Sequence, residues 1–332
     1  MKTVEEFKEH YERELMPALN ELNGRRKKVA GGVVAVAVVG LALMVSPLAV
    51  GMIASVVAPD SAYLCCCLGA VPFFAGVAVI GFGNGMVTKG YRKDYKDQVV
   101  GKVVKFIDEG LEYRPSQGIE TSAYHDSKIF LTHVDRYHSE DFISGTVGKT
   151  KVEFSEVHAE YKTEYRDSKG HRHTQWHTIF RGIFFVADFN KDFKGLTLVV
   201  PDTAQKLFGS LVGSFFQSHS IGRPDLVKME DPEFEKLFVV YGNDQVEARY
   251  ILSPSLMQRL VEYKKKTGKT LHFSFNKSQV YVAIPYNKDL FEPRIFRTLM
   301  DYDEVKGYFE DLKLVTSIVD ELNLNTRIWS KT

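Results

Sequence analysis

Three histidines near the middle of the chain have the spacing of metal ligands on a β-strand. His171, His173 and His177 lie at alternate positions of a run rich in strand-forming residues, so their side chains would share one face. Imidazole nitrogens arranged in this way can hold zinc or another divalent ion when a carboxylate lies nearby. The chemistry that this set could support is therefore metal binding.

The carboxylate would come from the preceding strand-like run. The turn "DSKG" (Asp167 to Gly170) joins the two runs as a hairpin, and if Arg166 pairs with His171, then Glu160 faces His177. Cross-strand Glu–His pairs on a solvated face need no metal, however, and we predict no metal and no cofactor. If a metal is bound, the candidate ligands are His171, His173, His177 and Glu160.

A fourth histidine could act as a general base. His158 lies close to Glu156 in "FSEVHAEYK", and a carboxylate near an imidazole can assist proton transfer. The sequence identifies no nucleophile and no oxyanion-stabilising partner for it. His158 is therefore the candidate catalytic residue of an enzyme, an activity that the sequence leaves open but does not favour.

Two glycine–lysine pairs match part of a phosphate-binding loop. Such a loop needs a small residue that four further residues separate from the Gly–Lys pair, and it must open a helix. That position is Ile143 ahead of Gly148 and Tyr263 ahead of Gly268, and strand-like sequence follows each pair. We therefore interpret both as turns that lead into strands.

Two long uncharged runs lie near the N-terminus. No charged residue occurs from Val29 to Ala58 or from Ser61 to Thr88, and Asp60 is the one charge between them. A helix of about 20 apolar residues crosses a bilayer. We predict a transmembrane helical hairpin (spans about 29–58 and 61–88) rather than two buried helices of a soluble core. The second run also holds all three cysteines, which we expect to pack as small apolar groups and whose role otherwise stays open: Cys65, Cys66 and Cys67.

Basic residues flank both runs on the side away from the connection "APDSAY", which has no positive charge. The positive-inside rule then places both termini in the cytoplasm, in a multi-pass protein. The same side chains could also contact lipid headgroups. They are Arg25, Arg26, Lys27 and Lys28 before the first run, and Lys89, Arg92 and Lys93 after the second.

Helical periodicity continues beyond the hairpin at both ends. Apolar residues recur every three or four positions from Phe7 to Leu22, and every four from Tyr91 to Ile107. These stripes would pack either against each other, as an antiparallel stalk, or separately on the main domain. The resulting division is a cytosolic amphipathic helix (1–28), the transmembrane hairpin (29–88), a helical stalk (89–109), a cytosolic α+β domain (110–300) and a C-terminal amphipathic helix (301–332).

The part after residue 110 alternates between strand-like and helix-like runs. A second hairpin is predicted around Asn276 to Ser278 in "KTLHFSFNKSQVYVAIP". Strands and helices in segregated runs are typical of an α+β fold. We therefore predict a transmembrane helical hairpin followed by a cytosolic domain with an antiparallel β-sheet and packed helices.

Composition and the absence of complete motifs limit the function. A net charge of +1 gives no case for nucleic-acid binding, and no catalytic constellation is complete. We predict a membrane-anchored cytosolic module that binds or scaffolds, with the lipid bilayer and a further membrane or cytosolic protein as its partners. The alternative is a membrane-associated enzyme that uses the His/Glu face, with a metal where one is bound. The oligomeric state is not predicted.

Several long stretches resemble a bacterial family catalogued as domain of unknown function 3137. The resemblance implies a two-span protein of the bacterial cytoplasmic (inner) membrane with a cytosolic domain, and it implies no activity or catalytic residue. The stretches are "FKEHYERELMPALNEL" (Phe7 to Leu22), "TKVEFSEVHAEYK" (Thr150 to Lys162), "FRGIFFVADFNKDFKGLTLVVPD" (Phe180 to Asp202), "MEDPEFEKLFVVYGNDQVEARYILSPSLMQRL" (Met229 to Leu260) and "LFEPRIF" (Leu290 to Phe296).

Overall fold

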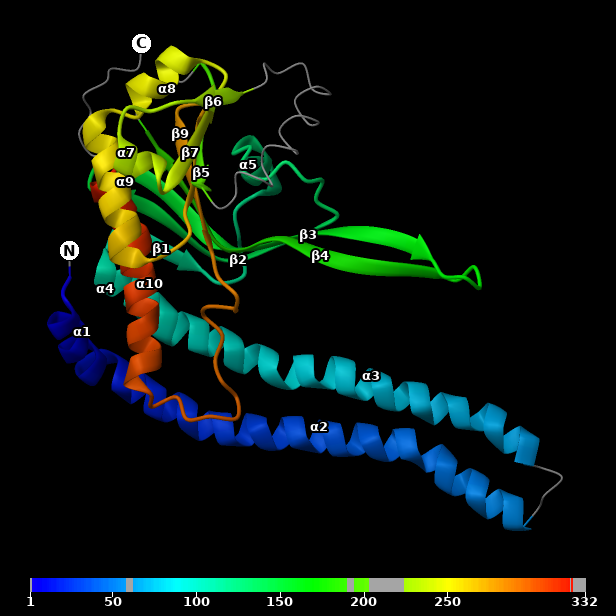
Figure 1. Ribbon diagram of the computed structural model, residues 1–332. Helices are drawn as coiled ribbons and strands as arrows, with labels where there is room; N and C mark the ends of the chain where they lie inside the picture. Colours follow the sequence, from blue (N-terminus) through cyan, green and yellow to red (C-terminus); the bar gives the residue numbers. More distant parts are fainter. Residues whose placement is uncertain (1, 58–61, 190–193, 203–223, 323, 325–332) are drawn as a thin grey trace. The chain divides into compact units, whose positions relative to one another are not determined.

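Two units make up the chain in the computed structural model, which describes residues 2–57, 62–189, 194–202, 224–322 and 324 (Figure 1). The helical unit comprises Thr3–Lys102 and Glu292–Lys306. The sheet unit comprises Met1–Lys2, Val103–Phe291 and Gly307–Thr332. A pair of long apolar N-terminal helices is followed by an antiparallel sheet with helices, so the predicted α+β fold with an N-terminal helical hairpin is confirmed.

Nearly continuous helix forms most of the helical unit. Thr3 caps the first helix through a capping box, in which its hydroxyl accepts from Glu6 N (3.2 Å) and the Glu6 carboxylate accepts from Thr3 N (2.7 Å). A π-helical turn precedes Pro17 and accommodates its missing N–H without ending the helix. The elements are α1 (Val4–His10), η1 (Tyr11–Leu15), α2 (Met16–Val57), α3 (Ala62–Tyr95) and η3 (Lys96–Val100), with α4 (Gly101–Ile107) continuing into the sheet unit.

Glycines let α2 and α3 approach each other closely. A Cβ added to Gly76 of α3 would lie 2.5 Å from the carbonyl oxygen of Gly40 and 2.7 Å from the Met44 side chain in α2. A Cβ on Gly83 would lie 2.8 Å from Val36 in the same way. Small residues at such crossings allow helix backbones to pack in an apolar solvent, where burial of apolar surface alone gives no drive to associate.

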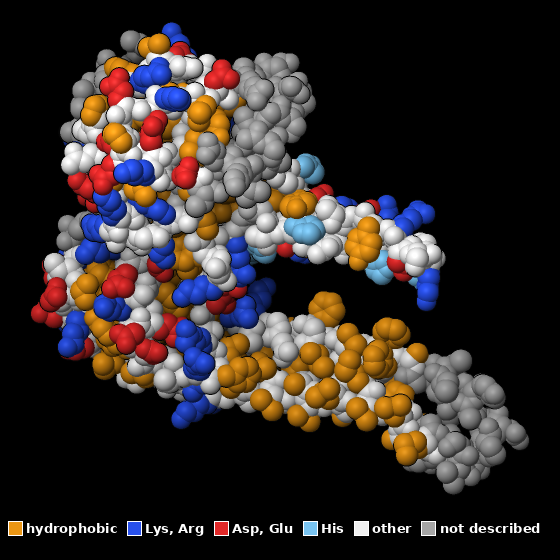
Figure 2. Space-filling model, viewed as in Figure 1, with side chains coloured by type: hydrophobic (Ala, Val, Ile, Leu, Met, Phe, Trp, Pro, Cys, Tyr) orange, Lys and Arg blue, Asp and Glu red, His pale blue; other side chains and the backbone are white. Residues whose placement is uncertain are grey.

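The surface of this hairpin is apolar and exposed. Each of the two helical stretches is long and apolar enough to cross a membrane, yet only 6% of the residues in each apolar segment are buried (Figure 2). Two helices in the core of a soluble protein would be mostly buried instead. The chain therefore has two candidate membrane spans. The cysteines at positions 65–67 lie within α3, but their side chains lie outside the described part of the structure.

The apolar stripe from Phe7 to Leu22, and the part of the second stripe from Tyr91 to Val100, are buried in the helical unit, whereas Val103 and the half-buried Ile107 belong to the sheet unit. Polar contacts also join the N-terminal helical segment to the segment at the end of α3 and the start of α4. Lys102 Nζ donates to the carbonyl of Glu14 (3.1 Å), and Arg25 forms an ion pair with Asp94. Tyr302, in the second segment of this unit, packs on the ring of Tyr11 with centroids 5.0 Å apart. The buried residues are Phe7, Tyr11, Leu15, Leu19, Leu22, Tyr91, Tyr95, Val99 and Val100.

A single antiparallel sheet organises the other unit. Its nine strands follow the order β1-β2-β3-β4-β9-β8-β5-β7-β6, and the predicted hairpin around Asn276 to Ser278 is confirmed as β8–β9. The strands are β1 (Leu111–Arg114), β2 (Arg136–Val147), β3 (Thr150–Arg166), β4 (Arg172–Asp188), β5 (Thr197–Pro201), β6 (Asp225–Val227), β7 (Phe238–Gly242), β8 (His272–Asn276) and β9 (Gln279–Pro285). The helices are α5 (Thr121–Asp126), α7 (Pro232–Glu235), α8 (Gln245–Ile251), α9 (Pro254–Thr267) and α10 (Tyr302–Glu321), of which α10 begins in the helical unit.

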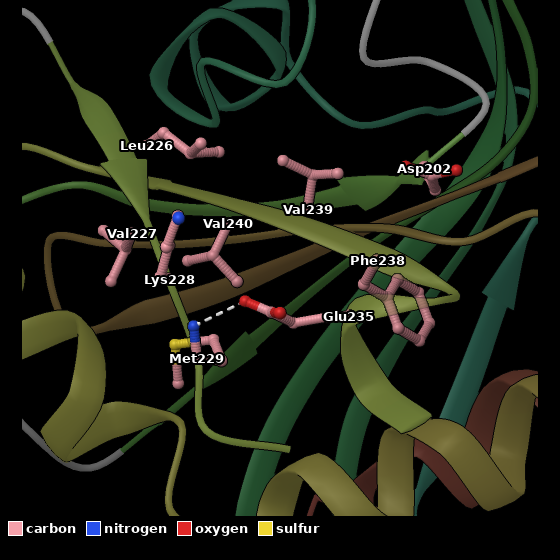
Figure 3. A pocket seen from close by; sticks show the side chains of 9 residues that line it. All are labelled: Asp202, Leu226, Val227, Lys228, Met229, Glu235, Phe238, Val239 and Val240. Carbon is pink, nitrogen blue, oxygen red and sulfur yellow. Dashed lines mark hydrogen bonds between the residues drawn. The ribbon is translucent and has the colours of Figure 1, made fainter. Parts of the chain in front are cut away.

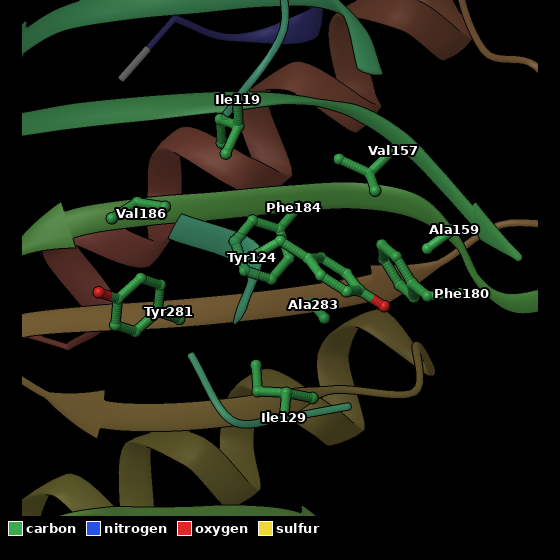
Figure 4. Packing of buried hydrophobic residues seen from close by; sticks show 10 residues of the cluster. All are labelled: Ile119, Tyr124, Ile129, Val157, Ala159, Phe180, Phe184, Val186, Tyr281 and Ala283. Carbon is green, nitrogen blue, oxygen red and sulfur yellow. The ribbon is translucent and has the colours of Figure 1, made fainter. Parts of the chain in front are cut away.

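Aromatic side chains fill the core between α5 and the central strands (Figure 4). Tyr124 of α5 is fully buried and lies against Phe184 of β4 (5.4 Å between ring centroids) and Phe130 (5.6 Å). Ile119 and Val157 close the cluster on the β3 side. Large aromatic rings bury much apolar surface each, so this cluster fixes α5 on the sheet.

Both glycine–lysine pairs that match part of a phosphate loop are turns, as predicted. Gly148 and Lys149 form the two-residue turn between β2 and β3, where Val147 pairs with Thr150. Gly148 has φ 63°, a left-handed conformation that glycine adopts readily. Gly268, also at φ 63°, caps the C-terminus of α9.

β3 and β4 extend beyond the rest of the sheet as a two-stranded arm (Figure 1). The pairing of β3 with β2 ends at Glu160, and the pairing of β4 with β9 ends at Gly182. Residues 161–177, which we call the arm, therefore pair only with each other, closed by a turn after Arg166.

The predicted register of the arm is wrong by one residue. Arg166 pairs with Arg172, not with His171, because the turn takes in His171 as well and is closed by hydrogen bonds between Asp167 and His171. As a result Tyr161, not Glu160, lies opposite His177. A one-residue slip moves every side chain to the other face. The predicted facing of Glu160 and His177 therefore does not occur.

Replacing Gly76 with leucine should separate α2 from α3. The new Cβ would meet the Gly40 carbonyl at 2.5 Å, and overpacking of this kind costs about 1–3 kcal/mol. That range corresponds to roughly 5- to 150-fold faster local opening. Hydrogen–deuterium exchange of α2 and α3 peptides, measured on the full chain in mild detergent, would report it.

Gly81→Leu is the matched control, because a Cβ at Gly81 has no neighbour within 4 Å. Its exchange should stay at the wild-type rate. Equal acceleration in both variants, or in neither, would contradict the close packing of the two helices.

Candidate functional site

The three arginines among the predicted membrane-flanking residues have partners within the helical unit. Arg25 forms its ion pair with Asp94. Arg26 donates to the Asn23 side chain (2.9 Å) and to the carbonyl of Ile295 (3.0 Å). Arg92 pairs with Glu292 (3.3 Å), which also accepts from the buried Lys96 (2.8 Å). These arginines therefore hold the unit together.

The four lysines of the same set are free. Lys27, Lys28, Lys89 and Lys93 are exposed, and within the described residues none has a hydrogen-bond or ion-pair partner. They lie where the apolar surface of α2 and α3 ends, and Figure 2 shows Lys and Arg side chains at that end of the hydrophobic surface. An unpaired ammonium group at the edge of an apolar helix can contact the phosphate of an anionic lipid. We call these four residues the lysine collar.

The candidate catalytic residue His158 lies in a polar network on β3. Its Nε2 is 3.3 Å from the hydroxyl of Thr178 and 3.7 Å from the carboxylate of Glu160. Partial burial lowers the pKa of His158, although the nearby Glu160 opposes this effect. Glu160 itself pairs with Arg136 at 2.6 Å. His158 is thus a neutral hydrogen-bonding group under ordinary conditions, and its hydroxyl neighbour is a strand threonine.

Glu156, two residues earlier on the same face, is the more unusual group. Burial raises the pKa of Glu156 to about 8. Its Oε2 accepts from Leu290 N (3.0 Å), and its carboxyl group also hydrogen-bonds to Asp289. Sequence reasoning used Glu156 only as a neighbour of His158, since nothing in the sequence indicates that residues 289 and 290 lie against it.

Asp289 carries the negative charge of this pair. Burial acts to raise its pKa, but the hydrogen bond and charge of Arg181 outweigh burial, so that the pKa of Asp289 is lowered. The same hydrogen bond raises the pKa of Arg181. The arrangement is a protonated Glu156 that donates to an ionised Asp289, which is in turn neutralised by Arg181. It fastens the segment after β9 to β3.

The four candidate metal ligands do not form a single cluster. His171 Nδ1 and His173 Nε2 both lie 3.1 Å from Asp167 Oδ2, while His177 Nε2 lies 2.9 Å from the Thr163 hydroxyl. Glu160 is occupied by its ion pair outside the arm. Among the described residues, no group of three or more His, Cys, Asp or Glu side chains is placed to hold a metal ion.

Aromatic stacking is what orders two of these histidines. His177 stacks on Tyr161 (4.9 Å between centroids, 22° between planes), and His173 stacks on Tyr165 (5.3 Å, 20°). The corrected register produces these pairs, since tyrosine and histidine now share a face. Tyrosine–histidine stacks are therefore the contacts that the structure shows on this face.

Two cavities lie at the other end of the sheet. One, of about 200 Å³, is lined by β6, β7 and Glu235, whose carboxylate accepts from Met229 N at 2.8 Å (Figure 3). The other, of about 500 Å³, lies between the α7 N-terminus and the start of α9, where Asp231 caps α7. Neither is lined by Glu156, His158 or the arm histidines. The titratable cluster and these cavities are thus separate.

Comparison with known proteins confirms the family resemblance over part of the chain. A family model described as "Protein of unknown function (DUF3137)" matches residues 178–324. No curated protein matches the chain. Among solved structures, the mycobacterial trehalose monomycolate transport factor A, TtfA, is similar over 70% of this chain and 98% of its own, with 8% identity and a TM-score of 0.36. A structural similarity with so low an identity and TM-score supports no conclusion about the function of this chain.

Glu156→Gln should change how stability depends on pH. The folded state retains a proton on Glu156 that the unfolded chain releases above about pH 4.5, so this contribution to stability is complete below that pH and is lost as the pH rises through about 8. The neutral amide can still accept from Leu290 N and donate to Asp289. At about pH 9 the variant should unfold with a free energy higher than that of wild type by on the order of 2 kcal/mol, and near pH 5 the difference should vanish.

Urea unfolding of the full chain in detergent, followed by near-ultraviolet circular dichroism of the packed aromatic rings, measures the free energy of unfolding at both pH values. Glu153→Gln, at an exposed position of the same strand, is the control and should show the wild-type pH profile. A wild-type profile for Glu156→Gln would show that the buried carboxyl is ionised in the fold.

Proposed function

Because the chain carries a DUF3137 domain together with two candidate membrane helices, we propose that it is a membrane-anchored binding module that holds this domain at the cytoplasmic surface of the bacterial inner membrane. The observation that carries the proposal is the hairpin of α2 and α3, whose apolar surface is exposed along its length and ends at the lysine collar.

The energetics of the hairpin support a bilayer as its surroundings. Exposed apolar side chains cost about 25 cal/mol for each Å² kept in water, and soluble proteins rarely expose a contiguous apolar surface of this extent. Large apolar residues more than half exposed follow one another along both helices. They include Val38, Leu41, Val45, Leu48, Met52, Val71, Phe74, Phe82 and Met86.

The distribution of charge supports the orientation. All seven basic flanking residues lie on the side of the chain termini, and the connection at residues 58–63 has none. Basic segments are retained in the cytoplasm. The proposal therefore places both termini, and with them the sheet unit, in the cytoplasm.

The state of the titratable groups favours binding over catalysis. Glu156 and Asp289 fasten a loop, and His158 bonds to neighbouring strand residues, so each has a structural role. The cavities lie elsewhere in the sheet unit. A partner at the membrane surface, lipid or protein, fits this distribution better than a small substrate held beside an acid–base pair.

The orientation predicts which positions a membrane-impermeant maleimide can reach. In a background with Cys65, Cys66 and Cys67 replaced by alanine, Asp60→Cys should be labelled in intact cells. Ser168→Cys, on the exposed turn of the arm, should be labelled only after the membrane is opened. Labelling of Ser168→Cys alone in intact cells would reverse the orientation, and labelling of both would mean that the hairpin does not span.

A further inference from the structure

The arm leaves aromatic side chains in solvent on both of its faces. Tyr165 is 56% exposed and Trp176 is 41% exposed, although both lie on a ribbon that no other strand covers. Arg136, from the end of β2, lies over the Trp176 ring at 4.2 Å. The arm is therefore a protruding surface of tyrosine, tryptophan, histidine and arginine, the side chains favoured where an apolar phase meets water.

The charges around the turn of the arm, at residues 162–172, are not balanced. Its carboxylates are already used, because Glu164 binds Arg172 (2.8 Å) and Lys162 (3.4 Å) and Asp167 binds two histidines. Arg166 and Lys169 have no side-chain partner within the described residues. Arg166 also lies directly opposite Arg172, and like charges at paired positions destabilise a ribbon. An anionic surface would relieve this repulsion and neutralise the free cations.

We propose that the arm is a membrane-contact hairpin, in which Arg166 and Lys169 bind anionic phospholipid headgroups while Trp176, on the same face as Arg166, enters the interface. The inference rests on the proposed function, since it takes the bilayer to be the one in which α2 and α3 are anchored. Basic side chains attract anionic lipid from within about one Debye length, and aromatic rings settle at headgroup depth.

The tether between the two units strengthens this contact. Since the sheet unit is covalently joined to the membrane helices, the headgroups are present at a high effective concentration, so that a small contact suffices.

The chain offers a direct probe of the contact. Its two tryptophans are Trp176 and Trp329, so Trp329→Phe leaves Trp176 as the sole tryptophan of the full-length protein. The protein is reconstituted into vesicles of brominated phosphatidylcholine, with or without about one third phosphatidylglycerol. Bromine quenches tryptophan that reaches the acyl region. We expect quenching of Trp176 to be at least twofold greater in the anionic vesicles, and to fall as salt is added.

Arg166→Gln with Lys169→Gln, in the same background, should abolish that difference. The matched control is Lys151→Gln with Lys236→Gln, which removes the same charge from exposed sites outside the arm and should leave it intact. Near-ultraviolet circular dichroism in detergent shows that each variant is folded. Equal quenching in the two vesicle types, or no quenching in either, overturns the arm proposal.

Flotation of the vesicles after alkaline extraction separates this failure from failure of the anchor. Protein that floats with unquenched Trp176 is anchored and lacks the arm contact. Protein that is extracted is not anchored by α2 and α3, which overturns the proposed function as well.

Discussion

The whole arrangement depends on two apolar helices that touch through their backbones. In lipid, apolar side chains gain nothing by leaving acyl chains for another apolar surface, so α2 and α3 can associate only through close packing. Gly40 and Gly76 make this possible, because a side chain on Gly76 would occupy the space of the facing backbone. In the proposed membrane-anchored arrangement, the pair would set the two points at which the chain leaves the bilayer, and those points would tether the rest of the chain.

Carboxyl groups then fix the segment that follows β9, once in each unit. In the sheet unit Glu156 accepts from Leu290 N and hydrogen-bonds Asp289. In the helical unit Glu292 pairs with Lys96 and Arg92. A buried carboxyl with a raised pKa is a familiar sign of catalysis. Glu156 has such a pKa, but its partners are the backbone of Leu290 and the carboxylate of Asp289 in a connecting segment, so its raised pKa reflects the cost of fastening a loop.

Local patterns revealed the hairpin helices, the β8–β9 hairpin and the turn at Gly148, because each depends on residues close in sequence. The register of the arm could not be predicted in this way, since it depends on a turn that takes in His171 and on a bulge between Ala159 and Glu160. The burial of Glu156 could not be predicted from the sequence either. It depends on contact with residues more than 130 positions away, which no periodicity on β3 indicates.

The composition of the arm suits a contact that is reversible. Tyr165 and Trp176 are two separate exposed rings on opposite faces rather than a continuous apolar patch, so the arm would bind lipid weakly if it were free in solution. Anchored in the same membrane, it needs only weak affinity, because the tether makes the contact intramolecular. Weak binding through Arg166 and Lys169 responds to the fraction of anionic lipid, whereas insertion of α2 and α3 does not. The local lipid composition would then decide how often the arm is docked.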